Sequence, residues 1–316
     1  MERVGVVRTN HANRKDYCLG RVGKVLAFGF ILLALIVVGC AAVPPAAEAP
    51  TVDSRPLLRL GAIPSERAEK IQDQYKGFIE YLERRTGFRI ELVVAQDYQG
   101  IIEKMGNKEL DIALLGPFSY VIAHETAGAH AFASPEYKLT GSNYTSNIIT
   151  HTGTGITSLV QLKGHSFSFT DPESTSGYLI PKAALLKQKI DPDRDFSQIL
   201  FLGHHDANVL AVKKRTVDAA AVSSNVLKSL LAKGIVDEDE IKILFTSDPI
   251  PQSVWAYRDG LSADLMAQVK QAFFNAHIES GALGIYAKDV NRFLPRDDAA
   301  YDIIRETTRL LNYKPQ

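Results

Sequence analysis

The segment Phe167–Tyr178, with the sequence FSFTDPESTSGY, decides how this 316-residue chain folds. Its first residues are typical of a short buried strand, and Asp171-Pro172 ends that strand. The following Ser174-Thr175-Ser176-Gly177 favours the start of a helix. Hydroxyl groups and unpaired backbone N–H groups then project from one helix N-terminus, where aligned peptide dipoles place partial positive charge. The segment therefore predicts an anion-binding site.

No lysine or arginine occurs between Ser166 and Pro181. An anion at this helix start would therefore be held mainly by directed hydrogen bonds, which select for shape as well as charge. A serine or threonine in this place is also a common helix cap that binds no ligand. The local pattern leaves both interpretations open, and the choice depends on whether other parts of the chain converge on the same place.

The composition favours a globular protein of two domains. Hydrophobic residues make up 46% of the chain and charged residues 23%, and the length suffices for two domains with their own cores. The 36 basic and 36 acidic residues balance, but residues 1–40 hold six of the basic and only two of the acidic ones, which leaves the rest at a net charge of −4. A mildly acidic body predicts no nucleic-acid partner.

The N-terminal region has the pattern of an export signal. Arg21 and Lys24 precede the uncharged run Val25–Val38, which is short for a membrane span but typical of a signal-peptide core. The run ends in Val37-Val38-Gly39-Cys40, which resembles a bacterial lipobox. We therefore expect a lipoprotein signal peptide at 1–40 and a lipid on Cys40. An uncleaved membrane anchor is the alternative, and the long polar lead before the core allows a start codon further downstream.

Cysteine usage and the next segment agree with export. Cys18 and Cys40 are the only cysteines, and both lie at or before the proposed processing point. The mature body is therefore expected to have no disulfide, no cysteine-based metal site and no cysteine nucleophile. Residues 41–56 are rich in alanine and proline and have no apolar period, which predicts a tether.

From Leu57 onward the chain alternates short apolar runs with helical patterns, which predicts an open α/β sheet with ligands at the carboxyl ends of its strands. The predicted elements are a strand at 57–63, a helix capped by Ser65, a strand at 89–95, a helix capped by Asp97 and a strand at 111–115.

A second region repeats this layout after a β-rich crossover at 147–151. The predicted elements are strands at 166–169, 199–202, 217–222 and 241–245, with helices opening at Ser174 and at 203–208. Helices at 262–280 and 299–311 are expected to pack on the first region. The result is one lobe at 57–146 plus 250–316 and another at 147–249, joined by two crossings that form a hinge beside a cleft.

Motifs for catalysis and cofactor binding do not occur in the sequence. It contains no G-x-G-x-x-G, Walker loop or H-E-x-x-H, and no serine stands in a nucleophile elbow. We therefore expect no enzyme activity, no cofactor and no metal.

Several spaced motifs follow one another along this two-lobe pattern. They are DIALLGPFSY at 111–120, DPESTSGYLIP at 171–181, GHHDA at 203–207, VDAAAV at 217–222 and PIP at 249–251. Together they resemble the phosphate/phosphite/phosphonate substrate-binding proteins of ABC transporters, over about Leu57 to Leu311. The ordered combination is more specific than any one motif, and it agrees with the two lobes derived from the residues.

The resemblance implies an α/β, two-lobed periplasmic-binding-protein fold of type II, the Venus-flytrap, whose lobes close over a phosphorus oxyanion. It implies that Ser174, Thr175 and Ser176 bind the oxygens through hydroxyl and backbone N–H groups. His205 would add a side-chain donor from the next helix start.

Other positions are implied to line the cleft or to tune it. Tyr98 and Tyr144 match lining positions of the family, where a phenol can donate a hydrogen bond while its ring excludes water; a structural role is the alternative. Ser119 and Asp206, like His204, stand beside motif residues and are specificity candidates or simply helix caps and loop residues.

The expected ligand follows from two neutral residues. Relatives that take an amine-bearing phosphonate have carboxylates where this chain has Asn225 and Ser253. A buried ammonium without a counter-charge is costly. We therefore expect phosphite, phosphate or a phosphonate with an uncharged head, and not 2-aminoethylphosphonate.

The sequence thus predicts a monomeric, extracytoplasmic solute-binding lipoprotein, anchored to a bacterial membrane through Cys40, that delivers a small phosphorus oxyanion to an ABC permease. The alternative is a ligand-sensing module of the same fold that reports to a signalling partner.

Overall fold

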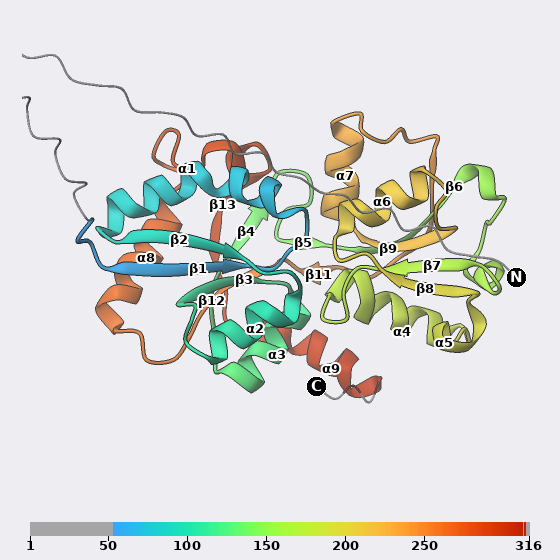
Figure 1. Cartoon of the computed structure of the whole chain (residues 1–316), viewed down its shortest axis with the longest axis horizontal. Coiled ribbons are helices and arrows are strands. Elements are labelled where there is room, and N and C mark those ends of the chain that lie inside the picture. The colour runs from blue at the N-terminus through green and yellow to red at the C-terminus, as the bar shows by residue number, and fades with distance from the viewer. Residues whose placement is uncertain (1–52, 312, 314–316) are drawn as a thin grey trace, which may run out of the picture. The chain divides into compact units, whose positions relative to one another are not determined.

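The computed structural model describes residues 53–311 and 313, which contain two mixed sheets flanked by helices (Figure 1). The first sheet has six strands in the order β13-β4-β12-β3-β1-β2, and the second has five in the order β10-β6-β9-β7-β8. We call the part built on the first sheet lobe 1 and the part built on the second sheet lobe 2. The predicted signal peptide, Cys40 and most of the tether lie outside the described residues.

Lobe 1 is a parallel trio of strands extended by antiparallel ones. β1 pairs in parallel with β2 and β3, and β12, β4 and β13 continue the sheet antiparallel. The strands are β1 (Leu57–Ala62), β2 (Arg89–Val94), β3 (Ile112–Leu115), β4 (His130–Tyr137), β12 (Val254–Tyr257) and β13 (Val290–Pro295).

Helices cover both faces of this sheet because the strand side chains alternate between two cores. Ile112 and Leu114 belong to a core with α1 and α8, whereas Ala113 and Leu115 belong to a core with α2, α3 and α9. The helices are α1 (Ala68–Thr86), α2 (Tyr98–Gly106), α3 (Pro117–Ala127), α8 (Ala263–Asn275) and α9 (Asp302–Leu310). The C-terminal helices thus pack on lobe 1.

Lobe 2 repeats the plan with fewer strands. β7 pairs in parallel with β8 and β9, and β6 joins β9 to β10 antiparallel. α6 and α7 share a core on one face, and α4 lies on the other. The elements are β6 (Ser146–His151), β7 (Ser166–Phe169), β8 (Gln198–Phe201), β9 (Ala219–Ser223), β10 (Ile241–Thr246), α4 (Ile180–Lys187), α5 (Pro192–Asp195), α6 (His205–Lys213) and α7 (Ser224–Ala232).

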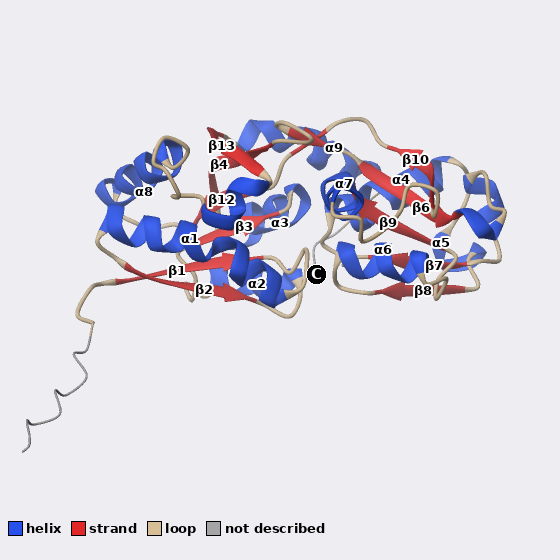
Figure 2. Cartoon of the chain, turned by 90° about the horizontal axis from the view of Figure 1, so that it is seen from above, coloured by secondary structure: helices blue, strands red, loops and turns tan. Residues whose placement is uncertain are grey.

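The two crossings between the lobes run side by side. The chain enters lobe 2 through β5 (Asn143–Tyr144) and returns through β11 (Ile250–Pro251), and these two strands pair antiparallel, with Ile250 opposite Tyr144. Figure 2 shows the two sheets, with the connection from β10 running back toward lobe 1. A short paired ribbon of this kind couples the two crossings, so we infer that they bend together as one hinge.

The antiparallel strands β4, β12 and β13 were not predicted. These strands pair with segments that are distant in the sequence, since β12 inserts between β3 and β4. Their short sequences also show no clear alternation of apolar and polar residues. The predicted helix cap at Ser65 is wrong. α1 begins at Ala68 after Arg67, and the carbonyl of Ser65 instead accepts the backbone N–H of His205 at 3.0 Å.

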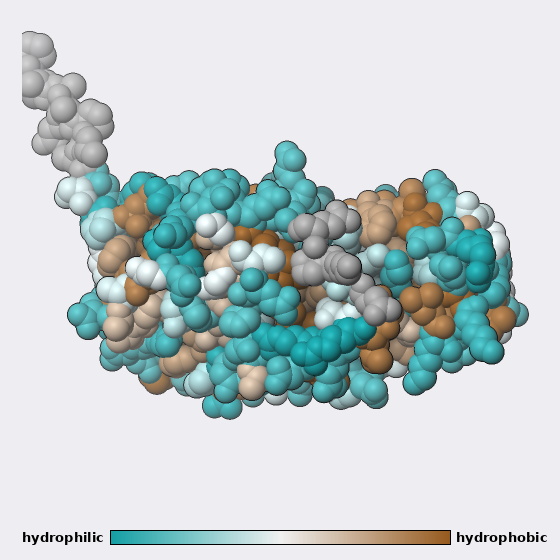
Figure 3. Space-filling model, turned by 90° about the horizontal axis from the view of Figure 1, so that it is seen from below, coloured by the Kyte–Doolittle hydropathy of each residue, from teal (hydrophilic) through white to brown (hydrophobic). Residues whose placement is uncertain are grey.

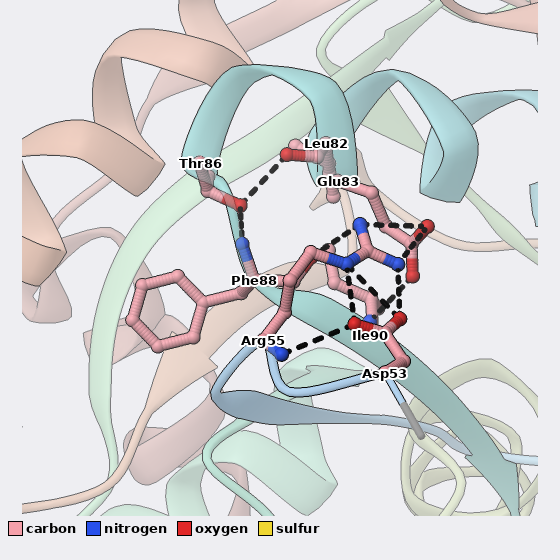
Figure 4. Close-up of polar contacts among 7 residues, drawn as sticks. All are labelled: Asp53, Arg55, Leu82, Glu83, Thr86, Phe88 and Ile90. Carbon is pink, nitrogen blue, oxygen red and sulfur yellow. Dashed lines mark hydrogen bonds and ion pairs between the residues drawn. The ribbon is translucent and has the colours of Figure 1, made fainter. Parts of the chain in front are cut away.

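The described chain begins in the last residues assigned to the tether, and these lie on lobe 1 (Figure 4). The guanidinium of Arg55 contacts the carboxylate of Asp53 at 2.7 Å and that of Glu83 at 3.4 Å, and Glu83 also accepts the N–H of Ile90. Arg55 holds the pKa of Asp53 down at about 2. Exposed ion pairs contribute little stability. These contacts nevertheless hold the segment at Asp53 and Arg55 against α1 of lobe 1.

Figure 3 shows one face of the molecule coloured by hydropathy. On the face shown in Figure 3, apolar residues occur in separate patches among hydrophilic ones. Among residues 53–311, no helix is long and apolar enough to cross a membrane.

Candidate ligand-binding site

The helix that begins after Ser174 starts with a π turn. Ser174 is its N-cap, and its hydroxyl oxygen accepts the N–H of Gly177 at 3.1 Å. The N–H of Leu179 reaches back five residues to the carbonyl of Ser174 at 3.0 Å, which defines the π turn η3 (Thr175–Leu179), and α4 continues from Ile180. π turns are rare and frequently occur at functional sites. The sequence predicted the cap and the helix but not this wider first turn.

Gly177 is required by close packing. A Cβ atom at this position would lie 2.2 Å from Oγ1 of Thr170 and 2.8 Å from Oγ of Ser174. Thr170 also donates its backbone N–H to the carbonyl of Gly177 at 3.0 Å. The π turn is thus pressed against the end of β7, which leaves no room for a side chain.

His205 is the first residue of α6 and is buried behind the turn. Its Nδ1 accepts the backbone N–H of Ser223 at 3.1 Å and lies 3.0 Å from Oγ1 of Thr170. Because Nδ1 acts as an acceptor, the ring is neutral and carries its proton on Nε2. Burial lowers the pKa of His205 to about 3, so the ring stays neutral at physiological pH.

Loops of lobe 1 reach across to these residues. The N–H of Phe118, at the start of α3, donates to Oγ1 of Thr175 at 2.8 Å, and the N–H of Tyr98, at the start of α2, donates to Asp171 at 3.3 Å. His204 donates from Nδ1 to the carbonyl of Pro64 at 2.7 Å, beside the bond between His205 and Ser65. Lobe 1 therefore contributes a backbone group to each of these contacts, and lobe 2 contributes mostly side chains.

A cavity of about 110 Å³ lies between these contacts. It lies where β1, β3 and β9 end, as expected for ligands of an open α/β sheet. All six predicted binding residues line it: Ser174, Thr175, Ser176 and His205 from lobe 2, Tyr98 from lobe 1, and Tyr144 from the first crossing. We call Ser174, Thr175, Ser176 and His205 the socket.

Both tyrosines stay protonated. Burial raises the pKa of Tyr144 to about 12 and that of Tyr98 well above its ordinary value, and Asp171 adds to the rise at Tyr98. Each phenol is therefore available as a neutral hydrogen-bond donor.

The four specificity candidates separate into two pairs. Asn225 and Ser253 line the cavity, whereas Ser119 and Asp206 do not. The hydroxyl of Ser119 donates to the carbonyl of Gly116 at 3.1 Å inside lobe 1. Asp206 lies 3.8 Å from the guanidinium of Arg67, and the contact joins the lobes outside the cavity.

Both polar atoms of the Asn225 side-chain amide already have hydrogen-bond partners within the protein. Its Nδ2 donates to Oε1 of Gln252 at 2.8 Å, and its Oδ1 accepts the hydroxyl of Thr140 at 2.6 Å. Gln252 also donates to Thr140 at 3.1 Å and to the carbonyl of Asn143 at 3.0 Å. Asn225 therefore attaches α7 to the hinge region. Gln252 was missed because nothing local in the sequence distinguishes it.

The cavity lining also contains groups that the sequence did not reveal. Tyr75, Tyr137 and Tyr286 form an aromatic wall, with the rings of Tyr75 and Tyr286 4.7 Å apart, and burial raises the pKa of all three well above the ordinary value. Glu66 and Asp289 add carboxylates. These residues come from α1, its preceding loop, β4, the 3-10 helix η4 (Gly284–Lys288) and the residue after it, so only the fold brings them together.

The match to a family model decides the classification. The model for "ABC transporter, phosphonate, periplasmic substrate-binding protein" matches residues 60–301. The chain belongs to this family. It is an extracytoplasmic substrate-binding protein of an ABC transporter.

Relatives and solved structures of the family agree. The chain is 31% identical to a phosphate-import protein of Mycolicibacterium smegmatis, over 78% of this chain and 84% of that one. The binding protein of a Pseudomonas aeruginosa phosphonate transporter superposes with a TM-score of 0.77 at 26% identity, over 82% and 87% of the two chains. A Prochlorococcus marinus protein in complex with methylphosphonate gives 0.74 at 20% identity, over 81% and 98%. The two-lobed fold is thereby confirmed.

We predict that Gly177→Ala destabilises this binding protein. The added methyl group would overlap Thr170 and Ser174, and overpacking typically costs about 1–3 kcal/mol. Urea unfolding should show a lower midpoint. Gly106→Ala is the matched control, because its Cβ would meet only Ala127 at an ordinary 3.5 Å. Equal stability of the two variants would contradict the packing argument.

We predict that His205 contributes to acid sensitivity. Its folded-state pKa is about 3 and the unfolded value is about 6.5, so the unfolded chain alone takes up a proton between these values. The free energy of unfolding should therefore decrease as the pH is lowered through this window, by up to about 1.4 kcal/mol per pH unit. His205→Asn keeps an acceptor near Nδ1 and should lose less stability on acidification than the unmodified protein, as measured by urea unfolding. The exposed control His277→Asn should lose as much stability on acidification as the unmodified protein. The same loss in His205→Asn would refute the assignment of this acid sensitivity to His205.

Proposed function

We propose that the cavity captures phosphite, phosphate or a phosphonate with an uncharged head for delivery to an ABC permease. The observation that carries this proposal is the convergence of Ser174, Thr175, Ser176, His205 and two tyrosines on one cavity at the start of a helix. Hydroxyl, imidazole and phenol donors arranged around a helix N-terminus suit an oxyanion.

Capture requires no chemistry in this proposal. The oxyanion docks on the socket, and groups of lobe 1 complete the site only when the lobes are together. A ligand that contacts both lobes favours the closed arrangement, because part of its binding energy exists only there. The described residues contain no cluster of side chains suited to a metal ion. We propose that the protein is not an enzyme.

The lining of the cavity favours a small ligand without a positively charged head. The socket offers donors to oxygen atoms, while Asn225 and Ser253 are neutral and Asn225 is already hydrogen-bonded. Glu66 is paired with Lys70, which reduces its value as a partner for a ligand ammonium. The M. smegmatis relative, named for phosphate import, supports a small phosphorus oxyanion.

The proposal also covers the oligomeric state, the membrane anchor and the boundaries of the lobes. We propose that the protein is monomeric and held at a bacterial membrane by a lipid on Cys40, with lobe boundaries at 57–146 plus 250–316 and 147–249. Because Arg55 attaches Asp53 to lobe 1, we place the end of the tether slightly before Leu57, at about residue 52.

A thermal-shift panel tests the ligand class. We expect phosphite and methylphosphonate to raise the melting temperature, because a ligand that binds the native state stabilises it by mass action. Phosphate is the third candidate, and sulfate and 2-aminoethylphosphonate should give no shift at equal concentration. Selective stabilisation by 2-aminoethylphosphonate would overturn the interpretation of Asn225 and Ser253.

Removing a socket hydroxyl should weaken binding without unfolding the protein. A hydrogen bond to a charged ligand is worth about 1.5–3 kcal/mol, or about tenfold to a hundredfold in affinity. We predict losses of this size for Thr175→Ala and Ser176→Ala by calorimetry with the best ligand of the panel. Thr175→Ser keeps the hydroxyl that also accepts the N–H of Phe118, and it should bind nearly normally. Unchanged affinity in both alanine variants would sink the assignment of the socket.

A further inference from the structure

We propose that the cavity binds its phosphorus oxyanion in the singly charged, protonated form and discriminates against the dianion. The inference rests on the proposed function, because it specifies the charge state of the ligand that the socket takes. It follows from the kinds of groups that both lobes bring to the cavity.

The donors of the cavity are neutral. Serine and threonine hydroxyls and the phenols of Tyr98 and Tyr144 carry no charge. His205 is neutral because its Nδ1 accepts the N–H of Ser223. Such donors stabilise an anion through partial charges, but they supply no whole positive charge to offset a second negative charge on the ligand.

The charged groups of the lining make a second negative charge costly. Among the described residues that line the cavity, Glu66 and Asp289 are carboxylates, and none is a lysine or arginine. Lys70 pairs with Glu66 but is not part of the lining. A second negative charge on the ligand therefore meets no whole positive charge in the lining. It faces Asp289 and the part of the Glu66 charge that Lys70 does not offset, and a like charge raises the pKa of an acid.

The residues around the socket add to this acidic environment. Asp171 is buried, and its carboxylate accepts the N–H of Glu173 at 2.9 Å. Asp97 caps α2 on the facing side of lobe 1. Asp206, beside His205, has Arg67 at 3.8 Å as a partly compensating charge. Tyr178, His204 and Tyr313 also lie near the socket, as does Lys182, whose ammonium donates to the hydroxyl of Tyr178 at 2.9 Å.

One protein group titrates in the same pH range as the proposed ligands. Burial and the neighbouring Asp171 raise the pKa of Glu173 to about 8. Its ionisation would also weaken anion binding at alkaline pH. The test must therefore separate a proton on the ligand from a proton on Glu173, and two ligands with different second pKa values do this.

The experiment measures the dissociation constants of phosphite and methylphosphonate by calorimetry as a function of pH, with the full chain and its Glu173→Gln variant. Methylphosphonate loses its second proton at a higher pH than phosphite. We expect the affinity of the variant to be level below the second pKa of each ligand and to fall by about tenfold per pH unit above it. The midpoint should move with the ligand. Phosphorus NMR should show bound methylphosphonate as the monoanion at a pH where the free ligand is the dianion.

The outcomes distinguish the possibilities. A midpoint common to both ligands, or an affinity that rises as the ligand loses its second proton, would overturn the inference while leaving phosphorus-oxyanion binding intact. Absence of binding at every pH would overturn the proposed function itself, and the inference with it.

A charge variant tests the physical cause. Glu66→Gln removes a negative charge from the lining and should strengthen binding at alkaline pH more than at acidic pH. Glu306→Gln changes an exposed carboxylate on α9 outside the lining and should leave the profile unchanged. An identical response of the two variants would refute the role of the cavity charges.

Discussion

An anion enclosed between two lobes by neutral groups must be held by hydrogen bonds alone, and the rest of this structure depends on aiming enough donors at one point. A charged side chain attracts an anion over several ångströms, whereas a hydroxyl or an N–H group must be in place to a few tenths of one. This demand accounts for the rigid surroundings of the socket. The π turn is pressed on Thr170 at Gly177, His205 is locked by Ser223, and the Ser174 hydroxyl is held by the turn itself.

The same demand explains how the lobes meet. Phe118 and Tyr98 contact lobe 2 through backbone N–H groups at the starts of α3 and α2, and the carbonyl of Ser65 receives the N–H of His205. Backbone groups at helix ends have no partner within their own helix, so they are available for a second lobe. The paired crossings β5 and β11 limit the motion to a hinge, which lets these groups find the same partners at each closure.

Features encoded by neighbouring residues were predicted from the sequence, whereas features formed by residues distant in the chain were missed. Three of the four socket residues, Ser174–Ser176, are consecutive, and the cap at Ser174 and the parallel strands β1, β3, β7 and β9 follow from short-range patterns. β12 was missed because its neighbours, β3 and β4, are more than a hundred residues away in the chain. Glu66 and Asp289 were missed for the same reason, since each reads locally as an ordinary surface carboxylate. The resemblance to a family supplied the binding roles, which local patterns alone left open.

A site built from neutral donors on both lobes also suits a protein that must release what it captures. A lysine or arginine would hold the anion even with the lobes apart, because its charge acts at a distance. Hydrogen bonds that require both lobes vanish when the lobes separate, so affinity becomes a property of the closed arrangement. We propose that carboxylates in the cavity lining, such as Glu66, sharpen this dependence, because they leave little attraction for an anion once the directed bonds are broken. If a permease opens the hinge, that motion alone would then be enough to release the ligand.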